Sequence, residues 1–444
     1  MRRQLQPHTR RQFLTTASAG AVAFAVQSRG LVVAADPAGV PEQIVVNDAA
    51  GFLGCVQAPA FADVPVTERQ LAAASAGRLC LREKPANASA AGPQIPLQLA
   101  GPAQGQRVRL GWIMPPGPSG RRVFQFEETG AASPAPIHAG EDAASGQFEM
   151  REGTRPVLRY NYQTVEPGEV LKSIAPGGLI YARPRSDYIH PLFGLDGEML
   201  TKDWSKDHPH HRGIYWAWPE VDWRGQRGDL HALQRVFARP TGKCTATSGP
   251  VFAQIEAENL WKWEDRDAIV RERTLLRAYR GTDRGRLIDL EFEFTALGDD
   301  VSVARRGTNA YGGLNIRCAE VRDQKIKFHT DAENAPQRMA WAELSGVFPG
   351  GKQPAGFLVF QHASNPDYPG DWVQYPNLNW FQPTFPAAKK RHVISRDRPL
   401  VLRFRLWLHR GPVAADETAG DQWRAYHTPT RGGTASNATV TAAS

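Results

Sequence analysis

Residues 207–213 read DHPHHRG, so one carboxylate, three imidazoles and one guanidinium fall within seven positions. Imidazole titrates near neutral pH, a neighbouring carboxylate fixes its tautomer, and a guanidinium binds carboxylates and oxyanions through paired hydrogen bonds. The run therefore predicts acid–base chemistry, with Asp207, His208, His210 and Arg212 as the catalytic residues.

Two other interpretations of this run stay open. His208 and His210 are candidate ligands of a divalent metal ion, with a third ligand from elsewhere in the chain. Alternatively, the imidazoles only satisfy backbone groups around a corner of the fold. The density of polar side chains weighs against this structural interpretation, because each buried polar group needs its own partner.

The backbone of the run is expected to enter a strand. Pro209 cannot donate a ladder hydrogen bond, so the segment is not the middle of a central strand. In an extended chain, alternate side chains point to opposite sides. This places His208 and His210 on one side with Arg212, and His211 on the other.

Aromatic residues follow directly, in the sequence IYWAW at 214–218. Trp216 and Trp218 share one face of the predicted strand, and indole rings stack on the apolar faces of sugars. We therefore assign Trp216, Trp218 and His211 to substrate binding.

Alternating hydrophobicity dominates the second half of the chain and predicts the elements that position this run. Apolar and acidic residues alternate in RLIDLEFEFTAL (286–297), and apolar and basic residues alternate in LVLRFRLWLHRG (400–411). The loop RGTDRG (280–285) predicts a hairpin, and residues 416–426 predict a short helix. A period of two over so many segments indicates a mainly β protein, a large antiparallel β-sandwich with one face of each sheet buried.

One polar strand face resembles a binding surface more than an ordinary solvated face. Arg403, Arg405, Trp407 and His409 form a basic, aromatic stripe of the kind that a concave sheet presents to a ligand. We assign Arg405 and Trp407 to substrate binding, with a solvated outer face as the alternative.

Further candidates lie in loops and strands elsewhere. Tyr311 and Arg317 flank a glycine pair at 312–313, where a chain turns or approaches a ligand, and Trp372 lies in the loop NPDYPGDW. We assign these three residues to substrate binding. Asn309 is an additional candidate, and either Glu291 or Glu293 is a candidate for the carboxylate that divides acid and base roles with histidine.

The chain begins with a predicted export signal. Residues 9–14 read TRRQFL, the twin-arginine form, and a mildly apolar run follows that is too short to span a bilayer. Small residues at 33–35 suit a signal peptidase. We therefore expect residues 1–35 to be a twin-arginine signal peptide and the mature protein to be periplasmic or secreted.

Charge and cysteine usage exclude several classes of protein. The formal net charge is +8, but five arginines lie in residues 1–35, which leaves +3 and no basis for nucleic-acid binding. No stretch is long and apolar enough for a membrane span. The four cysteines form no C-x-x-C pair, so a zinc ribbon or thioredoxin-type site is excluded. Export permits a disulfide, and Cys55 with Cys80 is the pair closest in sequence.

Composition divides the mature chain into parts. Residues 36–150 are rich in alanine, glycine and proline and predict an N-terminal β-rich region, with 129–146 as a loop or linker. Residues 155–430 predict the main sandwich, and 431–444 a disordered tail.

Three stretches carry a family resemblance: HPLFGLDGEMLTKDWSKDHPHHRGIYWAW (190–218), YGGLNIR (311–317) and NPDYPGDWVQY (365–375). They resemble the bacterial PmoA-like family, whose members are often labelled methane oxygenase. The resemblance covers about residues 155–430. It implies a galactose-mutarotase-like super-sandwich with an N-terminal β appendage, and a saccharide substrate. The long apolar helices of a membrane methane monooxygenase have no counterpart in this sequence.

These observations together predict an exported carbohydrate-active enzyme of hydrolase, lyase or epimerase type, acting on a saccharide or sugar-derived substrate. A non-catalytic saccharide-binding protein is the main alternative, and a metal-dependent oxygenase component, as the family label suggests, is the second. Any cofactor is expected to be a divalent metal. No Walker loop, Rossmann glycine pattern or G-x-S-x-G elbow is present.

The export prediction has a direct test. Twin-arginine translocation depends on the arginine pair, so replacing both Arg10 and Arg11 with lysine is expected to leave the unprocessed precursor in the cytoplasm. Immunoblotting of cell fractions measures the outcome. Unchanged export of the doubly substituted chain would contradict the prediction.

Overall fold

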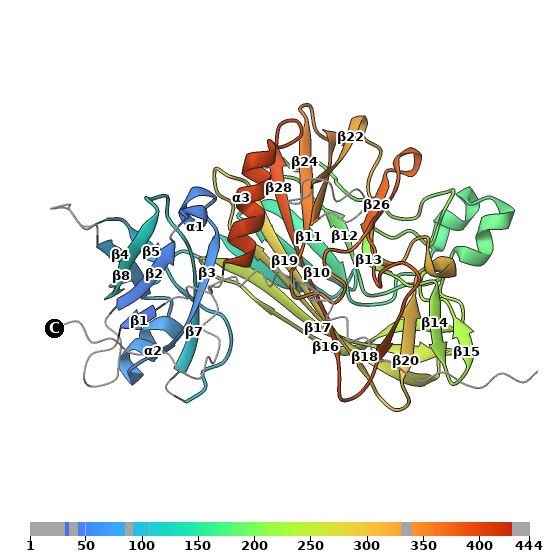
Figure 1. Ribbon diagram of the computed structural model, residues 1–444, viewed down its shortest axis with the longest axis horizontal. Helices are drawn as coiled ribbons and strands as arrows, with labels where there is room; N and C mark the ends of the chain where they lie inside the picture. Colours follow the sequence, from blue (N-terminus) through green and yellow to red (C-terminus); the bar gives the residue numbers. More distant parts are fainter. Residues whose placement is uncertain are drawn as a thin grey trace, which may run out of the picture.

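The computed structural model describes residues 32–34, 43–48, 50–84, 92–105, 107–329 and 340–428 (Figure 1). The predicted signal peptide, apart from the backbone of 32–34, and the predicted tail at 431–444 lie outside the described residues. Among the helices of these ranges, none is long and apolar enough to cross a membrane.

Two large antiparallel sheets form the main sandwich. The first large sheet has eight strands in the order β25 (Trp372–Tyr375), β26 (Trp380–Pro383), β21 (Gly313–Arg317), β13 (Ile214–Ala217), β12 (Tyr188–Leu192), β11 (Arg155–Asn161), β10 (Gln147–Glu152) and β9 (Ile137–Asp142). The second large sheet has the order β16 (Val236–Thr247), β17 (Phe252–Trp263), β18 (Asp267–Tyr279), β19 (Arg286–Ala296), β28 (Leu400–Arg410), β24 (Ala355–Gln361), β23 (Trp341–Val347) and β22 (Arg322–His329).

Smaller elements complete this part of the chain. A four-stranded sheet has the order β15 (Gln226–Gly228), β14 (Glu220–Trp223), β20 (Val301–Ala304) and β27 (Arg391–Ile394). Four short 3-10 helices are η1 (Gly168–Ser173), η2 (Pro176–Tyr181), η3 (Arg306–Thr308) and η4 (Pro376–Leu378). The helix α3 (Asp416–His427) follows β28.

The predicted alternation is confirmed in the second large sheet. On β19, Ile288, Leu290, Phe292 and Phe294 are buried in the core, while the residues between them face the other side. The predicted hairpin joins β18 to β19 in antiparallel register, and α3 covers the predicted helix. The core that these residues share with the first large sheet is the main hydrophobic cluster of the molecule.

The two tryptophans assigned to sugar binding lie in this core instead. Trp216 and Trp218 stack at 4.5 Å between ring centroids, and Trp216 packs edge to face on Phe292 at 4.8 Å. Their relative exposures are 3% and 0%. The prediction that they share a face is confirmed, but it is the inward face, because β13 points Tyr215 outward.

A separate β unit precedes the sandwich and lies to one side of it (Figure 1). Its five-stranded sheet has the order β1 (Val32–Ala34), β2 (Gln43–Asp48), β8 (Gly120–Glu128), β4 (Leu79–Lys84) and β5 (Gln94–Pro96). Its three-stranded sheet has the order β3 (Pro59–Pro65), β7 (Arg107–Ile113) and β6 (Gln98–Leu99), and its helices are α1 (Phe52–Cys55) and α2 (Glu68–Ser75). A hydrophobic core of its own lies between these elements.

This N-terminal unit is packed firmly onto the sandwich. Phe61 contacts Phe252 and Tyr279 of the second large sheet at 6.3 and 6.4 Å between ring centroids. The side chain of Gln98 bonds the backbone of Val251 and Phe252, with three contacts of 3.0 Å. A loosely attached unit is therefore ruled out, since buried apolar and hydrogen-bonded contacts both hold it.

The boundary between the two parts also differs from the prediction. Residues 137–142 and 147–152, assigned to the N-terminal region and its linker, form β9 and β10 of the first large sheet. β9 is an edge strand with mostly exposed side chains, so it lacks the apolar alternation by which a strand is recognised.

The predicted disulfide is not formed, and all four cysteines are free. Cys55 is exposed on α1 with its sulfur 4.0 Å from a carboxylate oxygen of Asp421. Cys80 is buried on β4, where burial raises the pKa of its thiol to about 11. The two side chains therefore occupy different environments.

A buried pair of acids lies between the two large sheets. Glu272 on β18 accepts a hydrogen bond from the Trp261 indole at 2.7 Å, and Asp187 accepts one from Tyr160 at 2.8 Å. Burial, followed by the charge of Asp187, raises the pKa of Glu272 well above its usual value. Burial also raises the pKa of Asp187, so this pair retains a proton in the folded protein above the pH at which ordinary carboxyl groups lose theirs.

This pair predicts how stability depends on pH. The folded state keeps a proton that the unfolded state releases above its ordinary carboxyl pKa of about 4.3, so stability falls as pH rises toward the raised pKa. Glu272→Gln is expected to remove this contribution, which is up to about 1.4 kcal/mol per pH unit. Urea unfolding across the pH range, with the outward-facing Glu293→Gln as control, measures it. A variant with the same pH slope as the wild type would contradict the prediction.

Candidate functional site: a histidine cluster on the outer face of the first large sheet

The histidine run forms a tight turn. The backbone N–H of His211 donates to the carbonyl of His208 at 2.9 Å, which closes a four-residue turn around Pro209. Consecutive side chains converge in a turn, whereas they alternate in an extended chain. The predicted separation of His211 from His208 and His210 is therefore wrong, because the rings of His208 and His211 stack at 4.8 Å between centroids.

Gly213 lets this turn lead directly into β13. Its φ is +62°, in the left-handed region, and a Cβ there would lie 2.2 Å from the carbonyl oxygen of Ile189 on β12. Only glycine fits such a backbone approach. The turn is thereby held against the first large sheet, with Gly213 donating to the carbonyl of Lys202 at 2.8 Å.

Three imidazoles meet below the turn. The rings of His210 and His211 lie 4.6 Å apart between centroids, and His231 lies 4.6 and 5.3 Å from them. Their potential ligand nitrogens all fall within 4.8 Å of one another. His231 comes from the loop between β15 and β16, so two distant segments build this histidine cluster, defined as His210, His211 and His231.

Two residues hold His231 in place. The guanidinium of Arg185 donates to the carbonyls of Leu230 and His231 at 3.0 and 2.6 Å, which fixes the loop. The hydroxyl of Tyr215, on the outer face of β13, lies 3.1 Å from Nδ1 of His231. A partner at one ring nitrogen fixes which nitrogen is left for another contact.

Burial keeps the three imidazoles uncharged. It lowers the pKa of His210 to about 3, with the neighbouring positive charges of His208 and Arg185 adding to the effect. Burial, followed by the charge of the other histidines or of Arg317, lowers the pKa values of His211 and His231 well below the usual range. Each ring therefore offers a lone pair at neutral pH.

A carboxylate and an imidazole lie side by side at the rim of the cluster. Asp207 and His208 are 3.0 Å apart, with side-chain exposures of 45% and 39%. Arg317, on β21, donates to both carboxylate oxygens of Asp207 at 3.3 and 3.4 Å and faces Nδ1 of His211 at 3.3 Å. Partial burial raises the pKa of Asp207, but the hydrogen bond from His208 and the charge of Arg317 outweigh it and lower the pKa. The carboxylate of Asp207 is therefore ionised where it meets solvent.

Aromatic rings surround the cluster. Trp380 on β26 lies 5.0 Å from His211, Tyr311 lies 5.3 Å from His231, and Tyr181 of η2 lies 5.1 Å from His210, between ring centroids. The two tyrosines beside the cluster are half-buried, whereas Trp380 is buried. Of the predicted binding residues, Arg317, Tyr311 and His211 are thus brought together with His210.

The cluster has the composition of a metal site, but with different ligands from those predicted. Two nitrogens bound to one zinc ion at about 2.1 Å are at most about 4.2 Å apart, so small side-chain rotations would bring the three imidazoles into range. Nδ1 of His210 is buried and has no hydrogen-bond partner among the described residues. His208 is not part of this group because it pairs with Asp207.

Arg212 was assigned a catalytic role and is instead enclosed by protein. Its guanidinium bonds the carboxylate of Asp203 and the hydroxyl of Tyr188, and lies 3.5 Å from the ring centroid of Trp204. Its relative exposure is 0%. The residue holds the 203–213 segment together and does not face the cluster opening.

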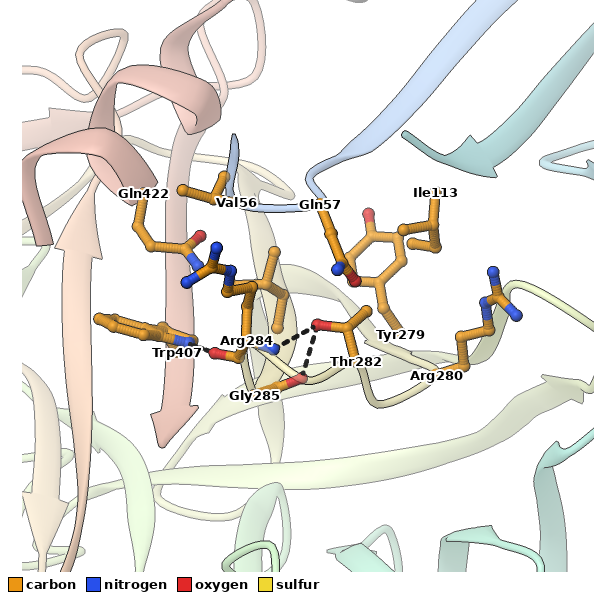
Figure 2. Close-up of a pocket in the computed structure, with 11 residues that line it drawn as sticks. Val56, Gln57, Ile113, Tyr279, Arg280, Thr282, Arg284, Gly285, Trp407 and Gln422 are labelled. Atoms are coloured by element: carbon orange, nitrogen blue, oxygen red, sulfur yellow. Dashed lines mark hydrogen bonds between the residues drawn. The ribbon is translucent and has the colours of Figure 1, made fainter. Parts of the chain in front are cut away.

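The arginine–tryptophan stripe lies on the opposite side of the sandwich. Arg405 pairs with Asp289 through contacts of 2.6 and 2.9 Å on the outer face of the second large sheet. Trp407 is buried beside the N-terminal unit and α3, where its indole N–H donates to the carbonyl of Arg284 at 2.8 Å (Figure 2). The outward orientation of both residues is as predicted, but neither reaches the histidine cluster.

The remaining candidates are distributed over the two sides. Trp372 packs on Phe381 and Phe328 at the edge of the first large sheet, at 5.9 and 6.2 Å between centroids. Glu291 pairs with Arg403 on the far side of the sandwich. Neither glutamate candidate therefore serves the histidine cluster, which has Asp207 at its rim.

The sequence does not indicate His231 of the cluster or three residues around it: Tyr181, Arg185 and Trp380. His231 stands alone in GDLHALQ, with no ligand spacing to mark it. Its position depends on a tertiary contact between its loop and β13. Such a contact leaves no pattern in the neighbouring sequence.

Comparison with known proteins adds one family match. A family model, described as a family of unknown function (DUF6807), matches residues 147–424, which contain the whole histidine cluster. One similar solved structure is a polysaccharide lyase, with 10% sequence identity and a TM-score of 0.26, over 51% of this chain and 31% of that chain. The matched part is thus less than a third of that lyase, and the likeness supports neither a shared fold nor a shared activity. No curated protein matches the chain.

The structural role of Arg212 predicts a loss of stability. Lysine keeps the charge of Arg212 but loses the planar fork that binds Asp203, so Arg212→Lys is expected to lower the free energy of unfolding by about 2 kcal/mol or more. The exposed two-contact ion pair of Arg410 with Asp196 provides the control, and Arg410→Lys is expected to cost less than about 1 kcal/mol. Chemical denaturation measures both. Equal effects of the two substitutions would contradict the assignment.

Proposed function

Because the chain belongs to a family of unknown function (DUF6807), its activity must be inferred from the site. We propose that the protein is a carbohydrate-active enzyme and that His210, His211 and His231 hold a divalent metal ion. The enzyme acts in the cell envelope, in keeping with the predicted twin-arginine signal.

The convergence of three uncharged imidazoles carries this proposal. Buried polar groups in proteins nearly always have hydrogen-bond partners, and an unpaired one requires an explanation. Nδ1 of His210 is buried without such a partner in the described chain. A metal ion supplies one, since neutral imidazole is a good ligand for zinc, copper, iron and nickel.

The surroundings support the ligand role. A metal-bound histidine commonly has a hydrogen-bond partner at its second ring nitrogen, which fixes the tautomer. The hydroxyl of Tyr215 has this relation to His231. Arg317 faces Nδ1 of His211 and competes with a metal for that nitrogen, and its contacts with Asp207 give it an alternative partner.

The rim suits proton transfer on a hydroxylated substrate. A bound metal would polarise a substrate oxygen or lower the pKa of a water molecule. Asp207 and His208 are exposed together beside it and can hold or move a proton, while Arg317 can bind an anionic oxygen. Hydrolase, lyase and epimerase reactions on sugars all require such proton transfer.

The tyrosines around the cluster favour a saccharide substrate. Tyr181 and Tyr311 are half-buried, and so is Tyr375, which stacks on Trp380 at 4.7 Å between ring centroids, so each combines an accessible ring with a hydroxyl group. Rings of this kind contact the apolar faces of sugars, while the charged rim bonds their hydroxyls.

The proposal predicts metal binding that depends on His231. The purified protein is expected to retain about one zinc ion per chain after dialysis. His231→Ala is expected to lower the affinity for zinc. The loss should exceed the roughly 10- to 100-fold decrease that is typical when only a residue supporting a ligand is removed. Zinc content by mass spectrometry and competition with a chelator measure this. His392→Ala, on β27 and outside the cluster, is the control and should bind zinc normally.

Turnover separates the proposed enzyme from its alternatives. Incubation of the zinc-loaded protein with neutral and acidic oligosaccharides is expected to give new products, and His231→Ala to give none. Sugar binding without turnover would favour a saccharide-binding protein. Stoichiometric iron or copper without sugar turnover would favour an oxygenase component. Absence of any bound metal would refute the metal site.

A further inference from the structure

A cleft of about 490 Å³ opens on the side of the sandwich opposite the histidine cluster. Residues on β19 and β28 that alternate with the core residues form its floor, including Asp289, Arg403 and Arg405. The histidine cluster lies on the outer face of the first large sheet, and the main core separates the two sites. This cleft is therefore a feature that the proposed activity does not use.

Three parts of the chain line the cleft. Phe61 and Arg109 come from β3 and β7 of the N-terminal unit, and Tyr426 comes from α3. The view in Figure 1 shows α3 between the N-terminal unit and the sandwich. The cleft thus exists only because the N-terminal unit covers part of the second large sheet and leaves the rest open.

The lining of the cleft is strongly basic. It includes four arginines against two carboxylates. Arg405 pairs with Asp289, and Arg403 pairs with Glu291, so these two arginines are neutralised. Arg109 lies 3.6 Å from Asp63, at the outer limit of an ion pair.

Arg277 is the cation left for a ligand. Its Nε donates to the neutral amide of Gln254 at 2.7 Å, and within the ranges that the structure describes it pairs with no carboxylate. The rings of Phe252 and Phe61 lie 4.6 and 5.0 Å from its guanidinium and hold it in place. A guanidinium fixed in this way at the lining of a cleft is suited to bind a carboxylate through two hydrogen bonds.

The cleft continues into a second hollow of opposite charge. This hollow, of about 370 Å³, shares Leu275 and Glu291 with the cleft, and is lined by Glu256, Glu258 and Glu293 as well. Its carboxylates repel an anion, so an extended ligand must place its negative group beside Arg277. The carboxylates and Lys243 along the hollow offer hydrogen bonds to the hydroxyls of neutral units.

We propose that this cleft binds an acidic oligosaccharide, with the carboxylate of a uronic-acid unit on Arg277. The volume is within the range of small-ligand sites. The floor carries the charged side chains of Arg277, Asp289, Glu291 and Arg403, and such a floor fits a hydroxylated chain better than a peptide, which requires separate pockets for its side chains. The site is distinct from the histidine cluster and serves to hold a substrate chain or a wall polymer.

The test measures binding of a tetrasaccharide with one terminal uronic-acid unit and three neutral units to the full chain by calorimetry. Arg277→Gln is expected to weaken binding about tenfold or more, the usual scale for a charge-assisted hydrogen bond. Arg277→Lys, which keeps the charge and loses the fork, is expected to weaken it less. Arg273→Gln is the matched control, because Arg273 lies on the same strand and face at the acidic end, and is expected to bind normally. Thermal unfolding confirms that each variant is folded.

Two further arms separate this site from the proposed active site. Repeating the Arg277 series in the His231→Ala background is expected to give the same loss, whether or not the histidine cluster holds a metal. A neutral galactose tetrasaccharide is expected to bind at least about tenfold more weakly than the acidic one. The proposal is overturned if the acidic sugar does not bind, if Arg277→Gln and Arg273→Gln weaken it equally, or if a tetraglutamate peptide binds as tightly.

Discussion

The packing of β13 into the core is the interaction on which the site depends. Trp216 points inward and stacks on Trp218 and against Phe292 of the opposite sheet, which fixes the rotation of the strand. Since alternate residues of a strand face opposite sides, the same contact turns Tyr215 outward, to the position where it holds His231. Gly213 then carries the chain straight into the histidine turn. A large apolar contact in the core thus sets the geometry of a polar cluster on the surface of the sheet.

The desolvation of charged groups explains the chemistry of this cluster. Each buried arginine nearby has its own partners: Arg212 has Asp203, and Arg185 has two backbone carbonyls and the ring of Tyr215. The imidazoles have the alternative of remaining neutral, because histidine loses its proton near neutral pH while arginine does not. Burial beside several guanidinium groups therefore selects the uncharged, ligand-competent form of histidine.

Local sequence patterns were sufficient for the elements and insufficient for the contacts between them. Strands β18, β19 and β28 alternate between apolar and charged residues, so their buried face could be read directly, and α3 was recognised from its composition. In IYWAW every position is apolar, so the period showed that Trp216 and Trp218 share a face but not that this face is the inner one. The turn at His208–His211 could not be told from an extended strand entry, since Pro209 suits both. His231 could not be recognised from the sequence, because its role depends on a contact with His211, 20 residues away. No spacing rule relates histidines at that separation.

The outer face of the second large sheet is covered over one part and open over another, and its arginines have different partners in the two parts. A polar outer face is normally solvated, and burying it carries a large desolvation cost unless the charges are paired. Where the N-terminal unit and α3 cover this face, Arg405 is buried and makes a two-contact ion pair with Asp289, and Trp407 is packed with apolar residues. At the edge of this cover, Arg277 packs on Phe61 and donates to Gln254, and it makes no ion pair within the described chain. The N-terminal unit therefore does more than protect the sheet, because its edge holds an arginine at the lining of an open cleft.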